Sequence, residues 1–243
     1  MADQPSGRHP VGPGLDGTAV TELGDDPLAG ATILGVLEES ERRYLASRSR
    51  RRKLDKGQIL FSEGENSNSV LVLLSGHLKV LRYSQDGDPF IVDTVVPGNS
   101  IGEVGVFSKG PRSATVQASE ESVVLELPEA VIMDLISTRP AACIALLERV
   151  SAMVRRLTGV AADLVFLDLR QRVAKYLLDR RPADSRSSNN RLTQTEVAAS
   201  IGASRQRVNA CLREFERQGW VSMESRRLRV VDPDGLARGV RLS

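Results

Sequence analysis

The chain has 243 residues, of which 41% are hydrophobic and 26% charged, a composition typical of one large or two small globular domains. No stretch approaches the roughly 18 apolar residues of a transmembrane helix, and two Cys and two His are too few for a four-thiolate cluster or a histidine-based metal site. The net charge of +2 divides unevenly, because residues 1–168 carry −6 and residues 169–243 carry +8. This asymmetry indicates a nucleic-acid-binding module at the C-terminus.

The N-terminal segment, residues 1–27, is rich in Gly, Pro, Asp and Thr, which predicts a disordered extension. It lacks the basic and apolar pattern of an export signal, so we expect a cytoplasmic protein. Residues 28–47 have helical spacing and predict one or two short helices. The basic run that follows, residues 48–53, is interpreted as a solvated face.

Residues 55–127 contain short β-branched segments separated by glycine. Strands are predicted within 70–81, 90–96 and 122–128, and five glycines recur every 11 or 12 residues: Gly64, Gly76, Gly87, Gly98 and Gly110. Evenly spaced short strands with glycine turns predict a compact antiparallel barrel or roll.

A long helix is predicted to begin at Thr138 as its cap, with Pro140 in the first turn. Six apolar residues of this helix recur at alternating spacings of three and four: Leu147, Val150, Val154, Leu157, Ala161 and Leu164. Such a seam predicts a homodimer formed by two of these helices. The alternative is a stripe that faces the roll of the same chain. Off the seam, Arg149, Arg155 and Arg156 are expected to face solvent.

Two further features lie between the long helix and the C-terminal motif. A second helix is predicted over 169–179, and the polar residues 180–191 are interpreted as a loop or linker.

The segment 192–221 has the pattern of a helix-turn-helix. Thr193 and Glu196 have the spacing of a capping box, and Gly202 stands at the turn before the second helix. The predicted buried residues are Val197, Ala198 and Ile201 on the first helix and Val208, Leu212 and Phe215 on the second.

The exposed face of the second helix predicts DNA recognition, because an α-helix fits the major groove and Arg can bind guanine through two hydrogen bonds. A hairpin after Trp220 would place basic side chains against backbone phosphates. The predicted DNA-binding residues are Ser204, Arg205, Gln206, Arg207, Asn209, Arg226 and Arg227. The alternative is a polar helix face in an enzyme subdomain.

A second chemical motif lies in residues 101–118. Gly102 and Glu103 are followed by Arg112, Ser113 and Ala114 in a glycine-rich segment. A turn of this kind can direct backbone N–H groups and the Ser hydroxyl toward one anion. Arg112 can hold a phosphate with two hydrogen bonds, and Glu103 can accept a hydrogen bond from a ribose hydroxyl. The alternative is a surface Glu–Arg pair beside a turn.

Taken in order, these motifs resemble the cyclic-AMP receptor protein/FNR family of transcription regulators, nearest its actinobacterial cyclic-AMP receptor members, over about residues 28–235. The resemblance implies an α+β protein with an N-terminal cyclic-nucleotide-binding β-roll, a long dimerisation helix and a C-terminal winged helix-turn-helix. The implied divisions are a 1–27 extension, a 28–137 roll, a 138–168 dimerisation helix and a 169–243 DNA-binding domain.

The family resemblance also implies roles for single residues. Glu103 would bind the ribose 2′-hydroxyl, Arg112 and Ser113 the cyclic phosphate with backbone help from Gly102 and Ala114, and Thr158 the adenine. Cyclic AMP is the expected allosteric ligand, with cyclic GMP second and no prosthetic group. The implied partners are a palindromic DNA duplex, a second copy of the chain and RNA polymerase, with no membrane.

Three departures from the family pattern bear on specificity. Leu157 replaces a polar residue that contacts the base, Gln206 replaces Glu, and Ala210 occupies a position that is basic in relatives. Two alternatives follow. One is a ligand-independent member that binds DNA constitutively and has a vestigial pocket. The other is a nucleotide-acting enzyme, which the absence of a nucleophile–base pair disfavours. The only other ligand candidate, haem at His77, is set aside because that residue is expected at the surface.

Overall fold

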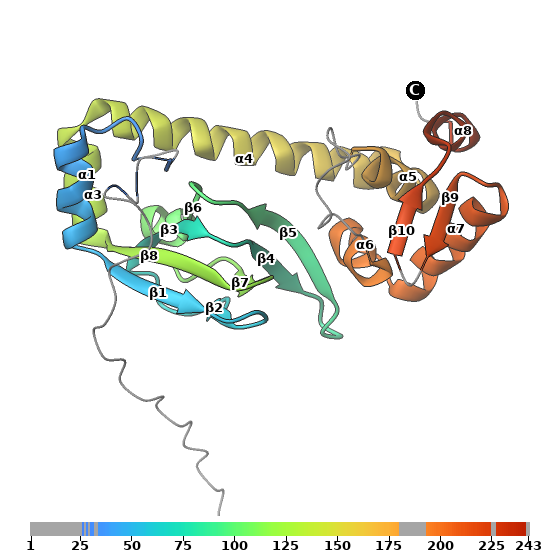
Figure 1. Ribbon diagram of the computed structural model, residues 1–243, viewed down its shortest axis with the longest axis horizontal. Helices are drawn as coiled ribbons and strands as arrows, with labels where there is room; N and C mark the ends of the chain where they lie inside the picture. Colours follow the sequence, from blue (N-terminus) through green and yellow to red (C-terminus); the bar gives the residue numbers. More distant parts are fainter. Residues whose placement is uncertain are drawn as a thin grey trace, which may run out of the picture.

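The computed structural model describes residues 26, 28, 30–31, 34–179, 193–224 and 227–241, without the side chains of Glu224 and Arg227. Figure 1 shows an N-terminal β-roll along one part of a long helix, α4 (Pro140–Phe166), and a second domain at the C-terminal end of that helix. The predicted α+β class is therefore confirmed. Apart from Asp26, the predicted extension lies outside the described residues, as does the predicted linker.

The roll consists of two four-stranded antiparallel sheets. The first has the order β1-β8-β3-β6, with β1 (Arg50–Leu54), β8 (Ser122–Pro128), β3 (Ser69–Ser75) and β6 (Ser100–Ile101). The second has the order β2-β7-β4-β5, with β2 (Ile59–Phe61), β7 (Thr115–Ala118), β4 (Leu78–Tyr83) and β5 (Pro89–Val95). The predicted run 70–81 is two strands, β3 and β4, joined at Gly76. The φ of Gly76 is +86°, and a Cβ there would overlap the backbone of Glu121 and Ser122.

Strand β3 separates two hydrophobic cores. Leu71 and Leu73 face the interior of the roll, whereas Val70 and Val72 pack with the helices α1 (Glu39–Ser47), α3 (Glu129–Thr138) and α4. Neighbouring residues of β3 belong to different cores because successive side chains of a strand point to opposite faces. The roll thereby holds α4 against its outer surface.

Strand β5 has one residue more than its partner β4. Val80 pairs with Asp93, but the next residue, Leu81, pairs with Ile91, so Val92 forms a β-bulge. A bulge bends the strand and redirects the side chains on either side of it.

Of three sequence predictions in this region, one agrees with the structure and two need correction. Among the described residues of 28–47 there is one short helix, Glu39–Ser47, in agreement with the prediction of one or two. Thr138 is the last residue of α3, and the cap of α4 is Arg139, which makes no side-chain cap hydrogen bond. The basic run is not a uniformly solvated face, because it forms most of the edge strand β1, in which Arg51 and Arg52 are half-buried and Arg52 lies 3.6 Å from Glu126.

Helix α4 exposes most of the predicted seam in the single chain. Leu147, Val154 and Leu164 are more than half exposed, whereas Val150 packs against the core of the roll. Arg155 and Arg156 are exposed as expected, whereas the side chain of Arg149 is largely covered.

The C-terminal domain contains α5 (Leu169–Asp179), α6 (Gln194–Ile201), α7 (Arg205–Arg217), β9 (Val221–Glu224), β10 (Arg227–Val230) and α8 (Pro233–Gly239). The predicted capping box is confirmed, since Thr193 Oγ1 accepts from Glu196 N and Glu196 accepts from Thr193 N. Gly202 ends α6 with a φ of +63°. All six residues predicted to be buried in this motif are buried, and β9 pairs with β10 as an antiparallel hairpin.

No single helix among the described residues is long and apolar enough to cross a membrane. Helices α3 and α4 reach that length and apolar character only when taken together, and they are bent by 113° where they meet.

Candidate functional site

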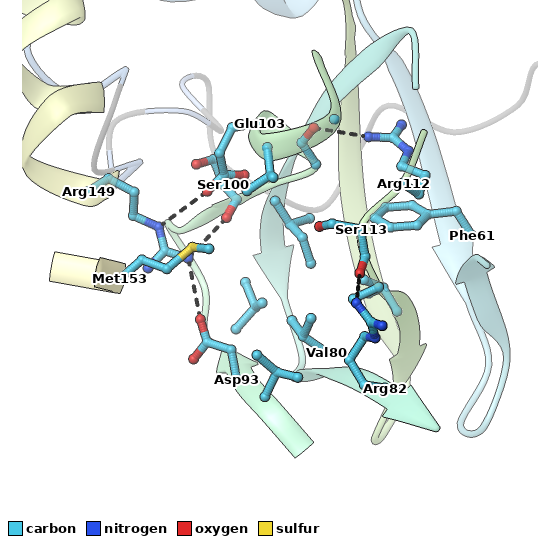
Figure 2. A pocket seen from close by; sticks show the side chains of 18 of the residues that line it. Phe61, Val80, Arg82, Asp93, Ser100, Glu103, Arg112, Ser113, Arg149 and Met153 are labelled. Atoms are coloured by element: carbon cyan, nitrogen blue, oxygen red, sulfur yellow. Dashed lines mark hydrogen bonds and ion pairs between the residues drawn. The ribbon is translucent and has the colours of Figure 1, made fainter. Parts of the chain in front are cut away.

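A cavity of about 260 Å³ opens between the roll and α4 (Figure 2). This volume lies just below the usual range for small-molecule sites, about 300–1,000 Å³. Its charged lining residues are Arg82, Asp93, Glu103, Arg112, Arg149 and Arg156. Its apolar lining residues are Phe61, Val80, Val92, Val95, Ile101, Val104, Ala114, Val116, Met153 and Leu157. The cavity therefore offers charge on some walls and an apolar surface on others.

Five of the six residues predicted to bind ligand line this cavity: Gly102, Glu103, Arg112, Ser113 and Ala114. The sixth, Thr158, is exposed on α4 and is absent from the cavity walls, and its hydroxyl donates to the Val154 carbonyl at 2.9 Å. Its neighbour Leu157 lines the cavity instead.

Arg112 is buried and held in place by the roll. Its Nη1 donates to the carbonyl oxygens of Ser69 at 2.8 Å and Gly102 at 3.2 Å, and its Nη2 donates to Ser69 Oγ at 3.0 Å. The guanidinium also lies 4.2 Å from the centre of the Phe61 ring. Burial lowers the pKa of Arg112, opposed by nearby carboxylates including Glu126. Its Nε has no partner among the described residues and is available to an acceptor on a ligand.

Glu103 begins the short helix α2 (Glu103–Ser108) directly after Gly102, whose φ is +92°. Its side chain is buried, and burial raises its pKa while Arg149 and Arg112 oppose that rise. In the described part of the chain, Glu103 Oε2 has no hydrogen-bond partner. A buried carboxylate oxygen without a partner is unfavourable, so a hydroxyl donor in the cavity would satisfy it.

Arg149 was expected in solvent, and that prediction is wrong. Its side chain is only 12% exposed, and its Nη2 donates to the Ser100 carbonyl at 3.2 Å. Its Nε lies 3.8 Å from Glu103 Oε1, beyond hydrogen-bond distance, and is unpaired within the described chain. Figure 2 shows Arg149 directed from α4 toward Glu103 and Asp93.

Asp93 joins β5 to α4. One of its oxygens, Oδ2, lies 2.5 Å from Arg156 Nη2 and 3.9 Å from Arg149 Nη2. Sequence reasoning missed Asp93 and Arg149, although the spacing of Arg149, Met153 and Arg156 on α4 marks one helical face. The physical reason for the error is that this face turns toward the roll.

The exposed surface of α7 carries the predicted DNA-recognition residues. Ser204 is at the N-cap position, without a side-chain cap hydrogen bond. Arg205, Gln206 and Arg207 are exposed, and Asn209 is half-buried with its Oδ1 unpaired in the described structure. Two further exposed basic residues, Arg213 and Arg217, continue the face of Gln206 at helical spacing and were missed.

The hairpin β9–β10 is in the position of a wing beside α7. Arg226 lies outside the described residues, as does the side chain of Arg227, so their predicted phosphate contacts remain predictions. Arg229 on β10 is exposed and adds a basic side chain to this hairpin.

Comparison with known families supports both halves of this architecture. Residues 51–139 match the cyclic nucleotide-binding domain, and residues 171–238 match the Crp-like helix-turn-helix domain. Together they define a transcription regulator with a cyclic-nucleotide-binding domain and a DNA-binding domain.

Individual relatives agree with this class. The CRP-like cAMP-activated global transcriptional regulator of Mycobacterium tuberculosis is 30% identical over 223 residues, covering 89% of this chain and all of that protein. The cAMP-activated regulator Vfr of Pseudomonas aeruginosa is 28% identical over 76% of this chain and 90% of its own length. The chain belongs to the cyclic-AMP receptor protein/FNR family, whose members are transcription regulators and not enzymes.

A solved structure confirms the fold. The c-di-GMP responsive regulator CLP of Xanthomonas campestris matches with a TM-score of 0.71 at 20% identity, over 79% of this chain and 99% of that one. The predicted α+β architecture of roll, long helix and helix-turn-helix is thus found in a known regulator.

Proposed function

We propose that this protein is a homodimeric, sequence-specific transcription regulator whose DNA affinity is controlled by cyclic AMP bound in the cavity. One observation carries the proposal. The cavity brings buried polar atoms of Glu103, Arg112 and Arg149 together, and Glu103 Oε2, Arg112 Nε and Arg149 Nε are unpaired in the described structure. Each unsatisfied buried group costs about 1–3 kcal/mol, which a suitable ligand would recover.

A cyclic nucleotide has the chemistry that these groups require. Its ribose 2′-hydroxyl can donate to Glu103 and accept from Arg149. Its cyclic phosphate carries one negative charge, which Arg112 and Ser113 can bind with backbone N–H groups of Gly102 and Ala114. The base would lie against the apolar wall near Leu157. Cyclic AMP is favoured over cyclic GMP because the two relatives above are described as cAMP-activated.

Homodimerisation is supported by the exposed seam of α4. In a dimer, Thr158 would approach the base from across the seam, a contact that a single chain does not make. Two copies of α7 related by a two-fold axis would read a palindrome with half-sites about 34 Å apart, with Arg205 binding guanine. The proposal also includes domain boundaries after residues 27, 137 and 168. Because members of the family regulate transcription, it further includes a cytoplasmic location and contact with RNA polymerase.

Two measurements test this function. Titration calorimetry should show cyclic AMP binding to the parent protein, and Arg112→Lys should weaken it at least tenfold, because Lys keeps the charge but loses the planar donor pair. Fluorescence anisotropy should show tighter binding to a duplex selected from a random pool when cyclic AMP is added.

The control is Lys56→Gln, an exposed change on the roll, which should leave cyclic AMP affinity as in the parent. DNA binding that is equally tight with and without cyclic AMP would reject ligand control and favour the constitutive regulator.

A further inference from the structure

The DNA-binding domain is in direct contact with the roll of the same chain. Helix α6 lies beside β5 (Figure 1), and Lys79 Nζ on β4 donates to Glu196 Oε1 on α6 at 3.0 Å. Burial alone would raise the pKa of Glu196, but the hydrogen bonds from Lys79 and Thr193 lower it overall. Glu196 thus belongs both to the capping box of α6 and to a contact between domains.

The contact continues along matching faces of the two elements. Ala199 follows Glu196 by three residues and therefore shares its face of α6. Leu81 follows Lys79 by two residues and shares its face of β4. Both Ala199 and Leu81 are buried, yet neither belongs to the hydrophobic core of its own domain.

The contact reaches the turn of the helix-turn-helix. A Cβ placed on Gly202 would lie 3.3 Å from the Phe90 ring of β5, so that ring packs against the turn. Ser204 and Arg205, at the start of the recognition helix, follow within three residues. The hairpin of β4 and β5 therefore spans from the first turn of α6 to the entry of α7.

The same hairpin forms a wall of the ligand cavity. Val80 and Arg82 line the cavity from β4, and Val92 and Asp93 line it from β5. Asp93 also ties the hairpin to α4 through Arg156. A ligand that changes the hairpin's position in the cavity must also change its contact with α6.

In helix-turn-helix proteins the first helix crosses the DNA backbone, and the start of the second helix contacts the bases. Here the hairpin lies against the start of the first helix and the turn before the second. We propose that the Lys79–Glu196 pair and the Phe90–Gly202 contact form an autoinhibitory latch, which holds the DNA-binding domain away from its DNA-competent orientation. This inference rests on the proposed function, in which a ligand enters the cavity; its entry moves the hairpin and releases α6.

The test uses the full chain without ligand and a labelled duplex selected by the parent protein. Lys79→Gln should tighten DNA binding about threefold, the order expected for loss of a partly exposed ion pair. Adding Phe90→Ala should raise the gain to about tenfold. Glu196→Gln retains a capping-box acceptor, and combined with Lys79→Gln it should give no further gain. Melting curves confirm that each variant is folded.

The control Lys56→Gln removes the same charge from an exposed site on the roll. Loss of a positive charge by itself weakens attraction to DNA, so tighter binding by Lys79→Gln and not by Lys56→Gln supports the latch. Unchanged or weaker binding by Lys79→Gln, matching the control, overturns it.

Adding cyclic AMP separates the two proposals. If the parent responds to cyclic AMP but Lys79→Gln binds DNA like the parent without ligand, the latch fails and the proposed function stands. If the parent ignores cyclic AMP but Lys79→Gln binds more tightly, the latch stands and control by that ligand fails.

Discussion

Arg149 and Glu103 show how single side chains define the pocket. Glu103 is buried and Arg149 is largely covered, and Arg149 Nε lies 3.8 Å from Glu103 Oε1, which is too far for a good hydrogen bond and close enough for one bridging hydroxyl. A hydrogen bond to a charged group contributes about 1.5–3 kcal/mol. Their joint arrangement therefore makes the ribose hydroxyl a principal feature by which this pocket would select its ligand.

We expect Arg149→Met to weaken cyclic AMP binding about tenfold, because it removes one of two groups that bind the 2′-hydroxyl. In the parent, 2′-deoxy cyclic AMP should bind about tenfold more weakly than cyclic AMP, whereas in Arg149→Met the two ligands should differ less. Calorimetry measures all four affinities. Arg155→Met, an exposed change on the same helix, serves as the control. Equal discrimination in parent and variant would show that Arg149 does not contact the hydroxyl.

The sequence predicts one half of this pocket and not the other. Glu103 and Arg112 belong to one glycine-rich segment, so their proximity is a local property that spacing reveals. Asp93 and Arg149 come from β5 and α4, and their meeting depends on which face of α4 the roll covers. That packing is a tertiary property, and the periodicity of α4 alone leaves it open.

At the scale of elements, the sequence predicts a helix end where the residues that form it are close together in the chain. The capping box of α6 and the turn at Gly202 depend on residues within one turn of each other, and both are confirmed. The cap of α4 was misplaced because Thr138 completes α3, and two consecutive helices meet at Arg139 without a spacer.

Two glycine substitutions should have opposite effects on stability. Gly202→Ala forces a left-handed conformation at φ +63° on a residue with a Cβ, which costs about 1–2 kcal/mol, and crowds Phe90. Gly159→Ala, in the middle of α4 with open space around it, should stabilise the helix by up to about 1 kcal/mol. Thermal unfolding followed by circular dichroism should show a lower Tm for the first and a higher Tm for the second. A Gly202→Ala protein as stable as the parent would contradict the requirement for glycine at this turn.

At the scale of the whole molecule, α4 has three faces in different surroundings. One face packs on the roll, a second lines the cavity, and the apolar seam remains exposed in the single chain. Exposed apolar surface of this extent indicates an interaction site, and the alternating spacing of the seam fits a second copy of α4.

We expect Val154→Glu to convert the protein from dimer to monomer, because two carboxylates would face each other across the seam. Sedimentation equilibrium should report half the parent mass, and binding to a palindromic duplex should fall at least tenfold. Ser151→Glu adds the same charge at an exposed position off the seam and should remain dimeric. If Val154→Glu retains the parent mass, the seam is not the dimer interface.

The additional residue in β5 makes strand length a determinant of function. A β-bulge places two residues opposite one on the partner strand, so it bends the strand and increases its local twist. Phe90 lies opposite Arg82 and Asp93 opposite Val80, so deletion of Val92 would keep this pairing and remove only the bend between the residue that packs on Gly202 and the residue that binds Arg156. The number of residues between Phe90 and Asp93 therefore determines the bend of β5, and with it how that strand reaches both α6 and α4. A β5 strand without this extra residue would keep the same side chains on the same faces and present them at a different angle to the two domains.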